Sequence, residues 1–135
     1  MTTHIRTAIL ALGLSAAVPA YALPPLHEDP VVLNGFYAIG LADEVRKNCP
    51  TIDPRIFRAL SYVQSLENYA RDQGYSKDEI KALQDNKAAK DALERQVRAD
   101  LAARGAVPGN PDGYCAVGEE EIARDSAAGR LLRVK

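Results

Sequence analysis

Histidine is scarce in this sequence, and its scarcity removes several classes of catalytic site. The chain has 135 residues and two histidines, of which only His27 lies beyond the apolar segment near the amino terminus. A Ser–His–Asp triad needs a histidine that its neighbours hold in place, and the prolines around His27 offer no such support. A zinc or copper site needs several ligands. We therefore predict no catalytic residue, no metal site and no cofactor.

Charge of one sign is also lacking, which argues against nucleic acid as a partner. The 17 basic and 18 acidic residues are mixed along the chain, whereas a phosphate-binding face needs concentrated Lys and Arg. Glycine-rich phosphate loops are absent, and the segment "GNPDG" at 109–113 has too few carboxylates for a calcium loop. We expect none of these ligands.

Only the amino terminus carries a sustained apolar run. Residues 7–17 are almost wholly apolar, Arg6 precedes them, and "AYA" at 20–22 places small residues where signal peptidase cleaves. This pattern predicts a cleavable secretory signal over residues 1–22, because the run is shorter than the about 20 residues of a membrane span. Its retention as a membrane anchor is the alternative. The mature chain is then expected to lack a membrane span and to keep 16 basic and 18 acidic residues once Arg6 is removed.

The sequence has two cysteines, Cys49 and Cys115, and no Cys-x-x-Cys motif. An even number of cysteines in an exported chain predicts a disulfide, so we expect one Cys49–Cys115 bridge. The bridge would close a loop of about 67 residues, for which chain entropy gives roughly 4 kcal/mol. Two free, buried thiols are the alternative.

Helical periodicity begins after a proline-rich arm at 23–30. A first helix is predicted over 31–48, because apolar residues recur every four positions along it. Its expected stripe is Leu33, Tyr37, Leu41 and Val45, with Phe36 and Gly40 beside it.

A second helix is predicted to begin at Asp53, as N-cap, with Pro54 in the first helical position, and to end at Gly74. Its residues at helical spacing are Ile56, Ala59, Leu60, Val63, Leu66 and Ala70. Ser76 and Glu79 form the capping-box pattern of a short third helix.

Two further helices are predicted over 87–104 and from about 112 to about 127, separated by the turn-rich segment "AVPGNPDG". Leu131 and Leu132 are expected to dock on the core. No segment alternates apolar and polar residues as a half-buried strand would. The sequence thus predicts an all-α fold, a small irregular bundle of four to five helices with one disulfide, as a single domain over 31–135.

An acidic run, Glu119–Glu121 with Asp125 nearby, is the one pattern that could support hydrolysis of glycans. That chemistry needs two carboxyl groups facing each other across a cleft, and Glu67 or Asp72 would have to supply the second. Such runs more often form a solvated face near a helix start.

Two weaker patterns suggest a protein partner. Arg55 and Arg58 follow the first cysteine closely and could meet an acidic surface, although pairing with local carboxylates is the simpler interpretation. Tyr62 and Tyr69 lie seven residues apart and share a helix face. Tyrosine is favoured at interfaces, but ordinary packing at the core boundary is the alternative.

The segments "NGFYAIGLADEVRKNCPTIDPRIFRAL" and "YCAVGEEEIARDSAAGRLLR" resemble a family of small secreted proteins from Rhodobacter-type alphaproteobacteria, catalogued as a domain of unknown function. The resemblance covers nearly all of the chain after residue 22. It implies a periplasmic location and a single module, and it supplies no activity, substrate or catalytic residue.

Two hypotheses on function follow. The first is a non-enzymatic periplasmic module that binds another envelope protein, either as a complex subunit or as a chaperone that holds unfolded clients in acid. The second is an enzyme that acts on cell-wall glycans through paired carboxylates. The sequence favours the first, and it leaves the identity of the partner and the oligomeric state open.

Overall fold

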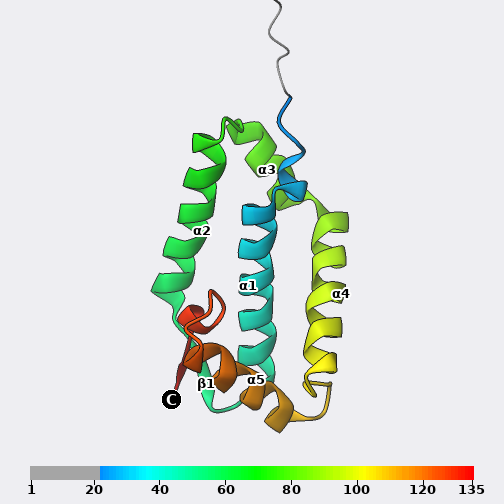
Figure 1. The fold of residues 1–135 in the computed structure, drawn as a ribbon, viewed down its shortest axis with the longest axis vertical. Coiled ribbons are helices and arrows are strands. Elements are labelled where there is room, and N and C mark those ends of the chain that lie inside the picture. The colour runs from blue at the N-terminus through cyan, green and yellow to red at the C-terminus, as the bar shows by residue number, and fades with distance from the viewer. Residues whose placement is uncertain (1–21) are drawn as a thin grey trace, which may run out of the picture.

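The computed structural model describes residues 22–135, so the predicted signal peptide, apart from Ala22, lies outside the described residues. Helix α1 (Pro30–Asn48) runs through the middle of the molecule, with α2 (Ile56–Asp72) and α4 (Lys87–Ala103) on either side (Figure 1). Helix α3 (Lys77–Asp85) connects α2 to α4 near one end of α1, and α5 (Pro111–Ala123) crosses its other end.

Four short elements complete the described part of the chain. They are the 3-10 turns η1 (Leu26–Glu28) and η2 (Gly129–Leu131) and the strands β1 (Ile52–Pro54) and β2 (Leu132–Val134). The two strands pair antiparallel. The predicted all-α bundle of four to five helices is confirmed, and this two-stranded sheet is the part that the sequence did not predict.

Helix α1 begins and ends near the predicted residues. Asp29 caps it by accepting hydrogen bonds from the backbone of Val31 and Val32, and Pro30 occupies the first turn. The single apolar stripe was too narrow a description, because α1 has neighbours on several sides. Its buried residues are Val32, Gly35, Ala38, Leu41, Ala42 and Val45, while Leu33 is exposed.

Tyr37 connects α1 to α4. Its hydroxyl donates to the Asp100 carboxylate at 2.9 Å. Burial first, and then this hydrogen bond and the charge of Asp100, raise the pKa of Tyr37 to about 12. Tyr37 therefore remains a neutral donor at physiological pH.

The predicted start of the second helix is wrong. Asp53 and Pro54 belong to β1, where Asp53 lies opposite Arg133 and Pro54 opposite Leu132. Helix α2 begins only at Ile56, after Arg55. A cap is a local preference worth about 1 kcal/mol, and strand pairing with the end of the chain takes precedence over it here.

The capping box of α3 is confirmed. The Ser76 hydroxyl accepts a hydrogen bond from the backbone N–H of Glu79 at 3.2 Å, and the Glu79 carboxylate accepts one from the backbone N–H of Ser76 at 2.7 Å. Gly74 lies between α2 and α3 with a positive φ of 102°, a conformation that glycine adopts without strain. Asn86 then caps α4 through the N–H of Ala89.

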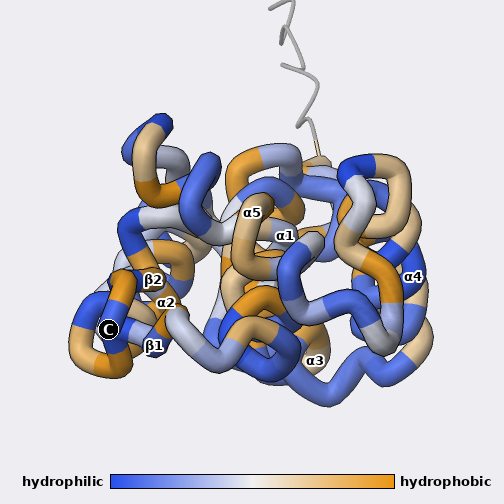
Figure 2. The backbone as a smooth tube through the Cα atoms, turned by 90° about the horizontal axis from the view of Figure 1, so that it is seen from below, coloured by the Kyte–Doolittle hydropathy of each residue, from blue (hydrophilic) through white to orange (hydrophobic). Residues whose placement is uncertain are grey.

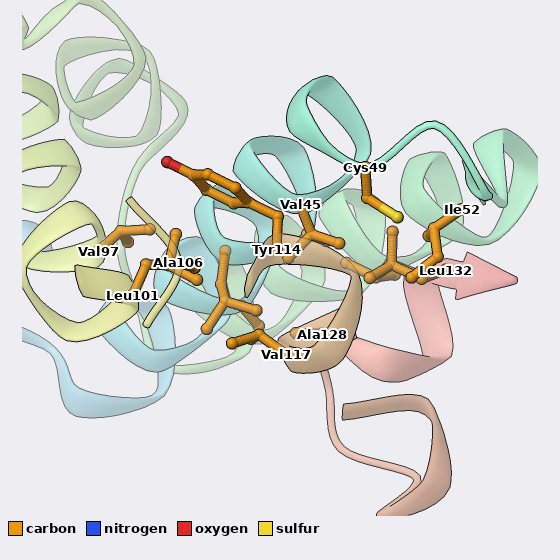
Figure 3. Packing of buried hydrophobic residues seen from close by; sticks show 14 residues of the cluster. Val45, Cys49, Ile52, Val97, Leu101, Ala106, Tyr114, Val117, Ala128 and Leu132 are labelled. Carbon is orange, nitrogen blue, oxygen red and sulfur yellow. The ribbon is translucent and has the colours of Figure 1, made fainter. Parts of the chain in front are cut away.

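The main core lies between α1, α4, α5 and the C-terminal segment (Figure 3). Val45, Ile52, Val97, Leu101 and Leu132 are almost completely buried there. Cys49 and Cys115 form a disulfide with a Cα–Cα distance of 5.0 Å, joining the end of α1 to α5. The predicted bridge and the docking of Leu131 and Leu132 are both confirmed.

A smaller core occupies the α3 end of the molecule and incorporates the proline-rich arm. It contains Leu26, Val32, Ala70 and Tyr75, and the Tyr75 hydroxyl donates to the carbonyl of Pro24 at 2.9 Å. Seen from below, α3 lies at the edge of the molecule among mostly hydrophilic segments, whereas hydrophobic stretches gather near α1 and α5 (Figure 2).

Candidate functional site

The first half of α2 presents large apolar side chains to solvent. Ile56 is 55% exposed, Phe57 87% and Leu60 63%. At 100° per residue these three positions span one side of the helix, and we call them the α2 surface. Such a stripe normally faces the core of a globular protein.

Helix α2 packs mainly through its second half. Leu66 and Ala70 are its buried residues, and Leu66 lies directly against Gly35 of α1. Nearer its start, Ala59 and Tyr62 pack partly against the main core, whereas Ile56 and Leu60 do not. The periodicity of α2 was correctly identified, but Ile56 and Leu60 of its predicted stripe are exposed rather than covered by residues 22–135.

A hollow of about 440 Å³ adjoins the α2 surface, between α2 and η2. It is lined by Phe57, Arg58, Ser61, Tyr62, Ala127, Arg130 and Leu131. Arg130 forms an ion pair with Asp125 at 3.0 Å. Arg58 has no ion-pair partner among the described residues and is exposed at the rim.

The structure brings together two of the four residues that the sequence suggested for partner binding. Arg58 and Tyr62 both line the hollow. Arg55 instead donates from Nε to the carbonyl of Leu132 at 2.9 Å, so it binds the C-terminal strand. Tyr69 lies toward the other end of α2, where its hydroxyl donates to Asp29 at 3.3 Å.

Phe57 was missed at the sequence level, although it is the most exposed large apolar residue of the described chain. It lies one position after Ile56, about 100° around the helix, so it belongs to the exposed side of α2 but not to the stripe that the sequence predicted. An isolated aromatic residue off a stripe is the only available signal, and it is a weak one.

The acidic run of α5 is not a uniformly solvated face, because Glu121 is buried. Its carboxylate pairs with Arg104 at 2.8 Å and also contacts Arg124 and the Ser126 hydroxyl. Burial alone would raise the pKa of Glu121, but the hydrogen bonds from Ser126 and Arg104 and the charges of Arg104 and Arg124 outweigh it and hold the pKa below its ordinary value.

The carboxylates considered for glycan hydrolysis lie in separate clusters. Glu120 pairs with Arg104 at 2.8 Å, in the same cluster as Glu121. Glu67 accepts a hydrogen bond from Gln84 of α3 at 3.0 Å, and α3 lies near the end of α1 opposite to α5 (Figure 1). Glu120 and Glu121 therefore contact arginine and serine side chains rather than a second carboxylate across a cleft.

Within residues 22–135, no three His, Cys, Asp or Glu side chains gather as ligands for a metal ion. None of the helices in that range combines the length and the apolar character that a bilayer span requires.

Comparison with known proteins gives a family and no activity. Neither a curated protein nor a solved structure matches the chain. Residues 24–133 match the family of unknown function DUF5333, a match that includes every helix and the disulfide described above. This chain therefore belongs to the DUF5333 family.

Proposed function

We propose that this protein is a non-enzymatic periplasmic module that binds another envelope protein through the α2 surface. The observation that carries the proposal is the exposure of Ile56, Phe57 and Leu60 on one side of a regular helix. Exposed apolar groups that cluster in this way commonly mark interaction sites.

The residue types around the α2 surface suit a protein partner. Aromatic residues and arginine are enriched where protein interfaces are best packed, and they supply most binding hot spots. Here Phe57, Arg58 and Tyr62 share one hollow. A helix carries them, so little conformational entropy is lost when they are covered.

The partner is expected to be apolar with an acidic edge. Arg58 has no carboxylate within ion-pair distance among residues 22–135, whereas neighbouring Arg130 is already paired with Asp125. A carboxylate on the partner would give Arg58 a counter-charge at the rim of the contact, and rim charges mainly raise association rates and specificity.

A periplasmic location is supported by two features. The expected signal sequence directs export, and the Cys49–Cys115 disulfide is typical of proteins in oxidising compartments. Measuring the amino terminus of the mature protein by mass spectrometry tests this part of the proposal. A protein retained intact in the cytoplasm would contradict it.

Site-specific cross-linking in intact cells tests the binding surface. A photo-reactive amino acid replaces Phe57 in one strain and Arg95, an exposed residue of α4, in a control strain. We expect one reproducible adduct with an envelope protein from position 57 and none from position 95. Equal labelling from both positions, or no adduct from position 57, would overturn the proposed surface.

A further inference from the structure

A separate apolar groove lies at the α3 end of the molecule. It encloses about 280 Å³ and is bounded by η1, α1, α2, α3 and α4, and we call it the α3 groove. Its apolar lining consists of Leu26, Val32, Leu33, Phe36, Val63, Leu66, Ala70, Ile80, Leu83, Ala89 and Leu93. Four helices thus direct apolar side chains at one unfilled space.

The helices around the groove are packed more loosely than the main core. Helix α3 has no buried residue, and Ile80 and Leu83 are only half-buried. In α4 the buried residues are Val97 and Leu101, both nearer its other end than Ala89. Protein interiors are normally filled to crystal-like density, so this space is available to a ligand.

The polar groups of the groove are few and mostly occupied. Glu67 and Gln84 hydrogen-bond to each other at 3.0 Å, and His27 lies 3.7 Å from Glu28. Lys90 has no ion-pair partner among the described residues. Its nearby acidic residue, Asp85, pairs with Lys81 at 2.8 Å. The groove therefore offers an aliphatic interior and one available ammonium group.

We propose that the α3 groove binds the hydrocarbon chain of a free fatty acid, with its carboxylate beside Lys90. The apolar part of the lining is aliphatic apart from Phe36, which suits a flexible alkyl chain. One ammonium group matches one carboxylate, whereas a phosphoglycerol headgroup would require more donors than Lys90 and His27 provide.

The size of the groove also favours one alkyl chain. Small-molecule pockets usually span about 300–1,000 Å³, so a volume of 280 Å³ fits a single chain of modest length. A partner helix, about 10 Å across with its side chains, would instead require an open trough. Here α3 and η1 both bound the space.

Helix α3 provides a route for entry. Its apolar contacts are limited to the half-buried Ile80 and Leu83, and regions with few buried contacts open most easily. The turn at Gly74 and the separate start of α4 at Asn86 lie at its two ends. The site shares none of the residues of the α2 surface, so the two proposals are independent.

Calorimetric titration of the disulfide-intact protein tests the groove. Dodecanoate, below its micelle-forming concentration, is expected to bind saturably with a stoichiometry of one. Dodecyltrimethylammonium has the same chain and the opposite charge, and it should bind more weakly. Absence of saturable dodecanoate binding would overturn the proposal.

Two variants locate the ligand. Ala89→Phe fills the groove and should abolish binding; where this variant does not fold, Ala89→Leu should still weaken binding. Lys90→Gln should weaken dodecanoate binding about two- to fivefold, the loss of one partly exposed charge contact, while Arg95→Gln on the same helix should have no effect. Wild-type affinity in the folded Ala89 variant, or equal effects at positions 90 and 95, would contradict the assignment.

A third titration tests whether the bound alkyl chain belongs to a free fatty acid or to a phospholipid. A lysophosphatidylglycerol with the same alkyl chain should bind more weakly than dodecanoate. Tighter binding of the lysolipid would overturn the assignment to a free fatty acid. Cross-linking from position 57 does not involve the groove, so it should continue in Ala89→Phe whichever result the titration gives.

Discussion

Glu121 shows how much one side chain can matter in a small fold. It is a buried carboxylate held by Arg104, Arg124 and Ser126, and it connects the end of α4 to α5 and the segment that follows. A buried charge that loses its partners destabilises the fold. The ion pairs of this cluster form only while the Glu121 carboxyl group is ionised.

The Glu121→Gln variant should lose about 1–3 kcal/mol of unfolding free energy, because Arg104 and Arg124 each lose one of two carboxylate partners and a buried hydrogen-bond network is broken. Denaturant melts at neutral pH measure this loss. Glu119→Gln, a change at an exposed neighbour on the same helix, should alter stability by less than about 0.5 kcal/mol.

Glu121 also predicts that the stability of the protein falls at acidic pH. The pKa of Glu121 lies below its ordinary value of 4.5 in the folded state. Its contribution is therefore complete above that value and is lost as the pH falls through the lower, folded-state pKa. Denaturant melts from neutral pH down to about 3 should show a smaller loss of unfolding free energy for Glu121→Gln than for the wild-type protein. If the stability of the two proteins fell in parallel with pH, this role of Glu121 would be excluded.

Gly118 provides a second prediction at the scale of one residue. A Cβ there would lie 2.5 Å from Cδ1 of Ile52 and 2.6 Å from Cγ1 of Val45, both fully buried. Gly118→Ala should therefore destabilise the protein by about 1–2 kcal/mol, despite the better helix propensity of alanine. Gly40→Ala, whose Cβ would lie 3.3 Å from Val97, should cost less in the same denaturant melts.

Replacing Phe57, unlike replacing Gly118, should affect binding and not stability. Because Phe57 is 87% exposed, Phe57→Ser should change the free energy of unfolding by less than about 0.5 kcal/mol while it weakens capture of the proposed partner. Gln64→Ser, an exposed change on the same helix, serves as the control for binding. A large loss of stability in Phe57→Ser would show that this side chain packs within the protein.

Among the elements, α3 is the one whose stability depends most on its own ends. It has a complete capping box and no buried residue, so local interactions rather than packing keep it helical. Ser76→Ala should remove about 1 kcal/mol of local stability and raise hydrogen exchange across α3, with little change in global melting. Ser61→Ala, at an exposed position of α2, should leave that exchange unchanged.

The elements also show which parts of the fold follow from local sequence. The limits of α1 and α4 and the start of α3 were predicted to within a residue or two because Asn48, Ser76 and Asn86 end or begin helices through their own neighbours. The start of α2 was not, because Asp53 pairs with Arg133 at the far end of the chain. Strand pairing over such a separation leaves no local signal in three residues.

The candidate site was predictable only in part. Arg58 and Tyr62 were identified from their residue types, but Ile56 and Leu60 have the same helical spacing whether they face a core or a partner. Helical periodicity indicates that a face is apolar, but it does not indicate what covers that face. The α3 groove has the same origin: Ile80 and Leu83 of α3 line a space that is incompletely filled.

At the scale of the whole molecule, the disulfide is the largest single constraint. Replacing both Cys49 and Cys115 by serine should lower the unfolding free energy by up to roughly 4 kcal/mol, a large share of the 5–15 kcal/mol typical of such domains. Denaturant melts of the double variant and of the reduced wild-type protein should agree. A variant as stable as the oxidised protein would show that packing alone holds α1 against α5.

The covalent ring closed by that bridge also determines what a protease can release. Helices α2, α3 and α4 all lie within it, together with the exposed loop before α5. A single cut anywhere from Pro50 to Tyr114 leaves both pieces attached, so the clipped protein would migrate as one species until a reductant separates it into two. In a compartment rich in proteases, such a molecule could be nicked and still remain in one piece.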